Sequence, residues 1–198
     1  KRVLNDVETE LGWMYETLHS DGKTKGRISY TVWSEVFACS ECSRDVVFVE
    51  AALDPQTKRI AEQIRCPHCG CEVSKETMTL QVESFVDPAT QQVNQRPRRV
   101  PVLIEYKVGK STFEKKPDAH DLAVLDRIGR MPLPEGMPTL TLPDCQMTRV
   151  GRMATTHTQA VHHLFVARAG HAMAALWRKV RATADKDTRR ALLFAFEQ

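Results

Sequence analysis

Two CxxC pairs lie in the first half of this 198-residue chain, Cys39 with Cys42 and Cys66 with Cys69, and 23 residues separate the pairs. A CxxC turn presents two sulfurs to one ion from a single tight loop, and amides of that turn point back at the thiolates. Two such turns supply the four tetrahedral ligands of a structural zinc site. The spacing therefore predicts a zinc ribbon. Because four thiolates leave no open position for water or substrate, we expect the zinc to be structural.

Other uses of these cysteines fit the sequence less well. A redox CxxC pair begins a helix in a βαβ pattern, whereas both pairs here lie among expected strands. Iron–sulfur clusters also take four cysteines, although two separated knuckles are more typical of zinc. Cys71 could replace Cys69 or remain free, and we interpret it as a spare thiol. We interpret His68 as a solvent-facing residue of the turn and assign no catalytic role to Cys145.

The rest of the composition bears on compartment and partners. No apolar run reaches the roughly 18 residues of a membrane span, and no charged start followed by an apolar stretch suggests a signal peptide. We therefore expect a soluble, cytoplasmic protein with no membrane partner. In a reducing cytosol, CxxC pairs more often bind metal than form disulfides. Four thiolates and one zinc would lower the formal charge from +3 to about +1, so only local charge clusters indicate a partner.

The order of the expected elements predicts an α+β fold. Strands are expected at 28–37, 46–53, 59–65 and 78–86, and a pair of strands around Gly109 at 99–115. The strands at 46–53 and 59–65 should form a hairpin that joins the cysteine pairs through a turn at Asp54 and Pro55. A short helix should follow Pro117, a Pro-rich linker should span 131–144, and a helical pattern runs from 158 to 183. Asp187 could cap a last helix.

These elements divide the chain into four segments, and both ends fall within helical patterns. We therefore expect an excised piece of a larger protein. The segments are an N-terminal helix and loop (1–27), a zinc-ribbon β module (28–95), a β-hairpin with a short helix and Pro-rich linker (96–145), and C-terminal helices (146–198).

Basic residues gather in clusters that suit phosphate contacts. One cluster lies between the cysteine pairs, a second lies on the strands that follow, and a third lies late in the long helical pattern. Each cluster could instead be an ordinary solvated face. We place the segment around "RPRRV" first. The predicted DNA-binding residues are Lys58, Arg59, Arg96, Arg98, Arg99, Lys107 and Lys110.

Four histidines lie along the helical pattern or its entry, at His157, His162, His163 and His171. Adjacent residues on a helix point about 100° apart, so His162 and His163 cannot readily serve one ion together. We interpret them as the polar edge of a packed helix rather than as a second metal site.

Several segments in order resemble the central insert of a class of bacterial DNA methyltransferases that carry a zinc ribbon. These segments are "GWMYETLHSDGKTKGRISYTVWSEVFACSECSRDVVFVEAALD", "RCPHCGCEVSK", "VPVLIEYKVGKSTFEKKPDAHDLAVLDRI" and "HTQAVHHLFVARAGHAMAALW". Such enzymes transfer a methyl group from S-adenosylmethionine to an amino group of adenine or cytosine. The resemblance implies that the chain helps to bind duplex DNA or to recognise its target.

The same resemblance implies what this chain lacks. In the family an FxGxG turn binds the cofactor, and a DPPY or DPPF tetrad grips the amino group of the flipped base. Neither motif occurs here, and the only DP dipeptides, in "LDPQT" and "VDPAT", are typical of turns. S-adenosylmethionine would then bind only to the parent enzyme, with the remaining catalytic domain as a partner, and the fragment alone would be inactive. The alternative is a structural or protein-interaction zinc ribbon without nucleic-acid contact.

Overall fold

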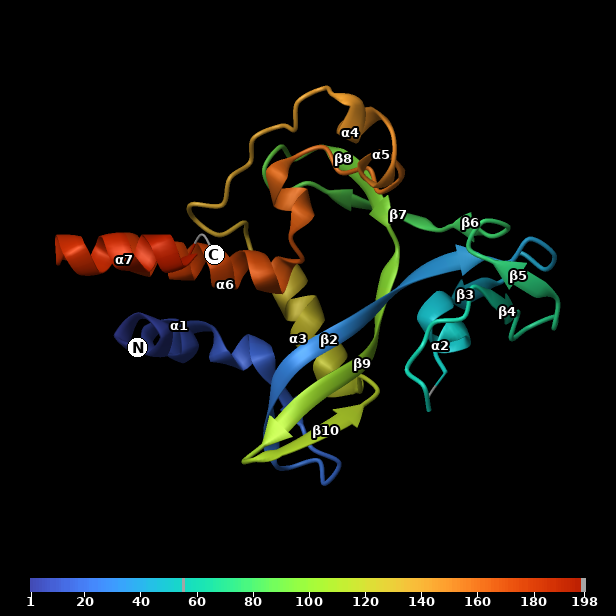
Figure 1. Ribbon diagram of the computed structural model, residues 1–198, viewed down its shortest axis with the longest axis horizontal. Helices are drawn as coiled ribbons and strands as arrows, with labels where there is room; N and C mark the ends of the chain where they lie inside the picture. Colours follow the sequence, from blue (N-terminus) through green and yellow to red (C-terminus); the bar gives the residue numbers. More distant parts are fainter. Residues whose placement is uncertain (55, 197–198) are drawn as a thin grey trace. The chain divides into compact units, whose positions relative to one another are not determined.

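The computed structural model describes residues 1–54 and 56–196 and has an α+β fold (Figure 1). The described residues form two compact units. The first unit is mainly helical and comprises residues 1–25, 88–90 and 119–196. The second unit carries most of the strands and comprises residues 26–54, 56–87 and 91–118. Among the described helices, none has the length and apolar character needed to cross a membrane.

The strands are short except for β2 and β9. In chain order they are β1 (Glu16–Leu18), β2 (Lys25–Ala38), β3 (Asp45–Val47), β4 (Gln63–Arg65), β5 (Glu72–Ser74), β6 (Thr79–Leu80), β7 (Val82–Val86), β8 (Val93–Pro97), β9 (Arg99–Val108) and β10 (Ser111–Lys115).

The main sheet of the second unit pairs β2 with β9 and β9 with β10, all antiparallel (Figure 1). Burial alternates along the second half of β9, because every second side chain faces the same side of a sheet. Ile104 and Tyr106 are accordingly buried, whereas Lys107 between them and the turn is exposed. The two strands expected around Gly109 are confirmed as β9 and β10.

The cysteine region is built from two hairpins, and their pairing differs from the expected one. β3 pairs with β2, and β4 pairs with β5. Of the strand predicted at 46–53, residues 46–47 lie in β3, and the rest of the prediction was wrong, because residues Phe48–Ala52 form helix α2. A helix is favoured over a strand here because Phe48 and Ala52, four residues apart, are both buried in the core beside the cysteines.

The expected hairpin between 46–53 and 59–65 is reduced to a short turn. Leu53 and Ile60 form a single β-bridge, and the N–H of Lys58 donates to the carbonyl of Asp54. Strand β4 begins only at Gln63. Asp54 opens the turn as expected, and Pro55 lies outside the described residues.

The strand expected at 78–86 is two strands with different partners. β6 pairs with β2, and β7 pairs with β8. Gln81 lies between β6 and β7, and its N–H donates to the carbonyl of Val36 while its own carbonyl accepts from Arg98 N–H. The change of partner at this residue explains why one apolar pattern gives two elements.

The helices of the first unit surround a small apolar core. The helices outside the second unit are α1 (Arg2–Leu11), η1 (Gly12–Tyr15), α3 (Ala119–Gly129), α4 (Gln146–Arg149), α5 (Arg152–Thr155), η2 (Val161–Leu164), α6 (Ala167–Arg181) and α7 (Lys186–Phe196). Leu11, Met14, Ile128 and Ala175 form the buried core of this unit. α1 and α6 are also joined by ion pairs from Glu10 to two basic residues of α6.

Two helical predictions need correction. The helical pattern at 158–183 is split into η2 and α6, with extended backbone at Phe165 and Val166 between them. The cap of α7 is Asp185 rather than Asp187, because a carboxylate oxygen of Asp185 accepts a 2.7 Å hydrogen bond from Thr188 N–H. The predicted helices after the chain start and after Pro117 are confirmed as α1 and α3.

Candidate metal centre

The first cysteine pair lies in the tight turn between β2 and β3. Cys39 N–H donates to the carbonyl of Arg44 at 3.0 Å, and Ser43 N–H donates to the carbonyl of Cys39 at 2.9 Å. Ser43 has a φ of 57°, in the left-handed region that closes such a turn. The ladder between β2 and β3 holds this turn at the end of a long strand.

The second pair lies in a turn with the same hydrogen-bonding pattern, between β4 and β5. Cys66 N–H donates to the carbonyl of Cys71 at 2.8 Å, and Gly70 N–H donates to the carbonyl of Cys66 at 2.9 Å. Gly70 has a φ of +75° and occupies the position that Ser43 has in the first turn. The two knuckles therefore match residue for residue, with Cys71 in the position of Arg44.

The sulfur atoms of both turns converge. The Sγ atoms of Cys39, Cys42, Cys66 and Cys69 all lie within 4.8 Å of one another. Cys39 Sγ is 3.8 Å from Cys69 Sγ, and Cys42 Sγ is 3.8 Å from Cys66 Sγ. Zinc–sulfur bonds of about 2.3 Å place tetrahedral ligands about 3.8 Å apart. The four sulfurs therefore fit a tetrahedral ion and form a possible metal site.

The metal centre borders an apolar core of the second unit. Cys39 and Cys66 are each 2% exposed, whereas Cys69 is exposed. Phe37 and Phe48 meet edge to face beside them, with ring centroids 5.8 Å apart. The inner cysteines are thus part of the core, and the outer ones lie toward solvent.

Without a cation the four thiols cannot all ionise easily. Backbone N–H groups of Cys42 and Glu41 donate to the sulfur of Cys39 and lower its pKa to about 6. The N–H of Arg44 lowers the pKa of Cys42, but burial and hydrogen bonds with the other thiols outweigh it and raise that pKa to about 11. A divalent cation would favour all four thiolates, so the arrangement suits a metal ion.

The outer thiol of the second turn behaves in the same way. The N–H of Cys71 lowers the pKa of Cys69, but the hydrogen bond with the Cys71 thiol and burial outweigh it and raise that pKa to about 11. Burial is the largest single influence on Cys66 and raises its pKa. Hydrogen bonds from the N–H groups of His68 and Cys69 outweigh burial, so the pKa of Cys66 is lowered. Each turn therefore stabilises negative charge on its first cysteine.

Two residues beside the four sulfurs, Cys71 and His68, can be compared with their sequence interpretation. Cys71 Sγ lies 3.1 Å from Cys69 Sγ and 3.4 Å from Cys39 Sγ, so it belongs to the sulfur group rather than standing apart. The only sequence signal for this position was the CxC spacing with Cys69. His68 is exposed, as expected, but its Nε2 is also 2.9 Å from the carbonyl oxygen of Asp45.

Four of the seven predicted DNA-binding residues form ion pairs on the surface of the second unit. The pairs are Arg96 with Glu83, Arg98 with Asp45, Arg99 with Glu35 and Lys58 with Glu114. A carboxylate beside each cation reduces the local positive field that phosphates would meet. Lys75 was not among the predicted DNA-binding residues, and its Nζ lies 4.5 Å from the ring centroid of Phe48.

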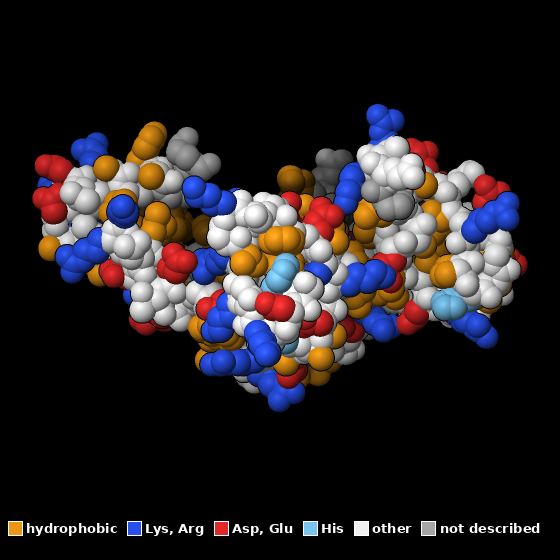
Figure 2. Space-filling view, turned by 90° about the horizontal axis from the view of Figure 1, so that it is seen from below, with side chains coloured by type: hydrophobic (Ala, Val, Ile, Leu, Met, Phe, Trp, Pro, Cys, Tyr) orange, Lys and Arg blue, Asp and Glu red, His pale blue; other side chains and the backbone are white. Residues whose placement is uncertain are grey.

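The other three predicted residues, Arg59, Lys107 and Lys110, are exposed, and within the described part of the chain none of them has an ion pair. Lys107 lies directly opposite Arg27 in the β2–β9 ladder, and Lys110 lies in the turn that joins β9 to β10. Figure 2 shows one face of the molecule, on which Lys and Arg side chains are interspersed with Asp and Glu. The basic side chains therefore form small groups on that face.

The histidines are distributed over a turn and two helices of the first unit. His157 has a φ of 53°, and His162 and His163 lie on the 3₁₀ helix η2 with ring centroids 4.3 Å apart. His163 Nδ1 accepts a hydrogen bond from Gln159 N–H at 3.3 Å. His171 is buried in α6, and burial lowers its pKa.

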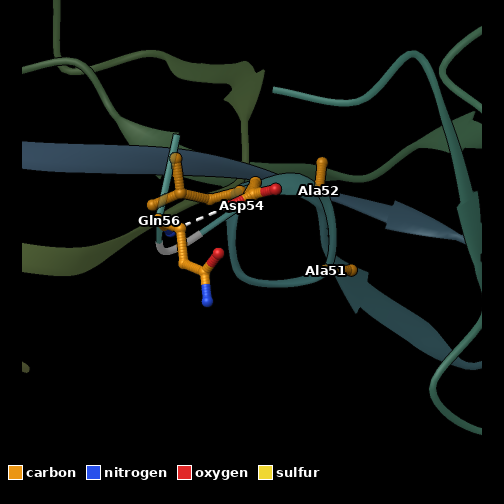
Figure 3. A pocket seen from close by; sticks show the side chains of 5 residues that line it. Ala51, Ala52, Asp54 and Gln56 are labelled. Atoms are coloured by element: carbon orange, nitrogen blue, oxygen red, sulfur yellow. Dashed lines mark hydrogen bonds between the residues drawn. The ribbon is translucent and has the colours of Figure 1, made fainter. Parts of the chain in front are cut away.

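A shallow pocket lies beside α2, lined by Ala51, Ala52, Leu53, Asp54 and Gln56 (Figure 3). The carboxylate of Asp54 accepts hydrogen bonds from the backbone N–H groups of Gln56 and Thr57, at 2.8 and 2.9 Å. These bonds lower the pKa of Asp54, and the bond from Thr57 N–H has the largest effect. The carboxylate of the pocket thus maintains the local turn.

Comparisons with known proteins add no assignment to this geometry: the chain matches no protein-family model, no curated protein and no solved structure.

Proposed function

We propose that this chain is a zinc-stabilised β module that contacts duplex DNA in the cytoplasm, as the insert of an S-adenosylmethionine-dependent DNA methyltransferase. The observation that carries the proposal is the group of four sulfurs, all within 4.8 Å of one another, of which two separations are 3.8 Å, the edge of a zinc tetrahedron. The resemblance of the sequence to methyltransferase inserts supplies the class of the parent enzyme.

The zinc ion has a structural role in this proposal. Cys39, Cys42, Cys66 and Cys69 would hold it, and four thiolates leave no position for a reacting group. The ion would join two hairpins whose local ladders contain only three residue pairs each. Such short hairpins are marginal alone, so the metal would contribute directly to the stability of this region.

The DNA-contacting surface is assigned first to Lys107 and Lys110. Both are exposed at the same end of the main sheet, and Lys107 faces Arg27 across the ladder. Exposed Lys side chains close together on one end of a sheet suit contacts with phosphate groups.

Methyl transfer and cofactor binding are assigned to the rest of the parent chain. This chain contains neither an FxGxG turn nor a DPPY or DPPF tetrad. S-adenosylmethionine would supply the methyl group there, and the residues of this chain would hold DNA in place. We therefore expect no methyl transfer by the isolated chain.

Binding of a fluorescent DNA duplex at several salt concentrations tests the proposed surface. The double variant Lys107→Glu/Lys110→Glu should weaken binding and lower the slope of log affinity against log salt by about 1 for each lost phosphate contact. The matched control, Lys186→Glu/Arg190→Glu, makes the same change of charge in α7 and should leave both quantities unchanged. Equal effects of the two double variants would contradict the assignment.

The second candidate function is a structural or protein-interaction zinc ribbon. The observation that favours it is the pairing of Arg96, Arg98, Arg99 and Lys58 with carboxylates, which leaves fewer cations for phosphate. If neither the chain nor its variants bind duplex DNA at low salt, while the chain binds zinc, this second function is the better account.

A further inference from the structure

The sulfur group contains a fifth member that a four-coordinate ion cannot use at the same time as the others. Cys71 Sγ is 3.4 Å from Cys39 Sγ, close to a tetrahedral edge of about 3.8 Å. It is only 3.1 Å from Cys69 Sγ. Two sulfurs at that separation are too close to occupy two corners of one zinc tetrahedron, so only one of Cys69 and Cys71 can be a ligand at a time.

We propose that Cys69 and Cys71 are interchangeable ligands for one coordination position, so that five thiols serve a four-coordinate zinc ion. The inference rests on the proposed zinc site and concerns how that site tolerates the loss of a ligand. It assigns a metal-binding role to Cys71, for which the sequence spacing favoured a spare thiol.

The backbone of the second turn permits the exchange. Both thiols belong to one turn and are separated only by Gly70, which has a positive φ of +75°, and their Sγ atoms lie 3.1 Å apart. A Cβ at Gly70 would meet no atom within 4 Å, so the turn is uncrowded there. The backbone of Cys71 is fixed by the hydrogen bond from Cys66 N–H, so only side-chain rotations are needed.

The first turn provides an internal comparison without a spare thiol. Its hydrogen bonds match those of the second turn, and Arg44 occupies the position of Cys71. Cys42 is the residue equivalent to Cys69, and its thiol has no cysteine two residues later in the chain. The proposal therefore predicts an asymmetry between the knuckles: loss of Cys69 is tolerated, and loss of Cys42 is not.

The exchange would make the centre resistant to damage at its most exposed thiol. Cys69 is exposed, whereas Cys71 is half-buried. Alkylation or oxidation of an exposed thiolate removes it as a ligand. With Cys71 able to take its place, the ion would keep four thiolate ligands after modification of Cys69.

The experiment compares four serine variants of the full chain, purified under reducing conditions. The variants are Cys42→Ser, Cys69→Ser, Cys71→Ser and Cys69→Ser/Cys71→Ser. Zinc content is measured by elemental analysis, zinc affinity by competition with a chromophoric chelator, and the number of thiolate ligands by the charge-transfer absorbance of the Co²⁺ form. Cys145→Ser serves as the control for removal of an exposed thiol outside the sulfur group.

The two single variants of the second turn should each bind one zinc with less than about a tenfold loss of affinity and a four-thiolate Co²⁺ spectrum. The double variant and Cys42→Ser should lose affinity by at least about 100-fold and show three-thiolate spectra. If Cys69→Ser or Cys71→Ser alone falls as far as Cys42→Ser, the exchange is excluded and the zinc site remains. If the wild-type chain binds no zinc, both the site and the exchange are excluded.

Discussion

The hydroxyl of Thr17 donates a 2.5 Å hydrogen bond to a carboxylate oxygen of Asp121, and the two residues are 0% and 3% exposed. This bond joins β1 to the first turn of α3 across more than half of the chain. A buried carboxylate requires such donors, because removal from water without a hydrogen bond is unfavourable. The contact therefore anchors α3 in the first unit.

Replacement of Thr17 by Val tests this anchor. The change keeps the shape of the side chain and removes the donor, so we expect the free energy of unfolding to fall by about 1–3 kcal/mol. Denaturant unfolding followed by circular dichroism measures the change. Thr9→Val is the matched control, because the Thr9 hydroxyl donates to Asn5 O on the exposed face of α1. A loss as large in the control would contradict a special role for Thr17.

A Gly26→Ala variant should destabilise the second unit. A Cβ at Gly26 would lie 2.4 Å from Cδ2 of Tyr106, whose side chain is buried in the main sheet. Overpacking of this kind lowers the free energy of unfolding by about 1–3 kcal/mol. Gly129→Ala, at the end of α3, meets no atom within 4 Å and should be neutral. The comparison is a pair of denaturation curves, and identical midpoints for the two variants would refute the predicted clash.

Capping of α7 should depend on Asp185 and not on Asp187. Asp185→Ala removes the acceptor for Thr188 N–H and should lower both the helix content and the stability of the chain, whereas Asp187→Ala should change neither. The hydroxyl and N–H of Thr188 lower the pKa of Asp185. A lowered pKa means that the carboxylate stabilises the fold above its unfolded pKa and that this contribution disappears as pH falls through the lowered value. The difference between Asp185→Ala and wild type should therefore vanish in acid.

Zinc binding should release protons near neutral pH. In the metal-free protein the pKa of Cys39 is about 6, and the pKa values of Cys42 and Cys69 are about 11. Cys39 is then ionised above pH 7, while the other two thiols must lose their protons to bind the metal, so affinity should rise with pH. Titration calorimetry in buffers of different ionisation enthalpy should give at least about two protons per zinc, those of Cys42 and Cys69. A value near zero would show that the thiols are already ionised.

The grouping of the four zinc-ligand candidates could be predicted because each CxxC turn is local. The sulfurs of Cys39 and Cys42 are presented by one turn whatever the rest of the chain does, and the same holds for Cys66 and Cys69. The main strands could be predicted for a similar reason, since β2 and β9 are both rich in β-branched and aromatic residues, a local property of the sequence.

Features that depend on distant partners could not be predicted. Residues 46–49 have strand-like composition, but burial of Phe48 and Ala52 on one side makes residues 48–52 helical. Arg98 pairs with Asp45, 53 residues away, so sequence alone left it as a free cation for DNA. The position of Cys71 depends on the closure of the second knuckle, which the spacing of cysteines does not describe.

The different spans of the strand pairings in the second unit imply an order of assembly. The hairpins β2–β3 and β4–β5 join residues that are close in the sequence. The ladder between β2 and β9 pairs residues far apart in the sequence, such as Ile28 with Tyr106. Loops that close quickly form first, and long-range pairing is slow. The pairing of β9 with β2 should thus limit the rate at which this unit refolds. The two cysteine turns should form earlier and be able to bind an ion before the main sheet is complete.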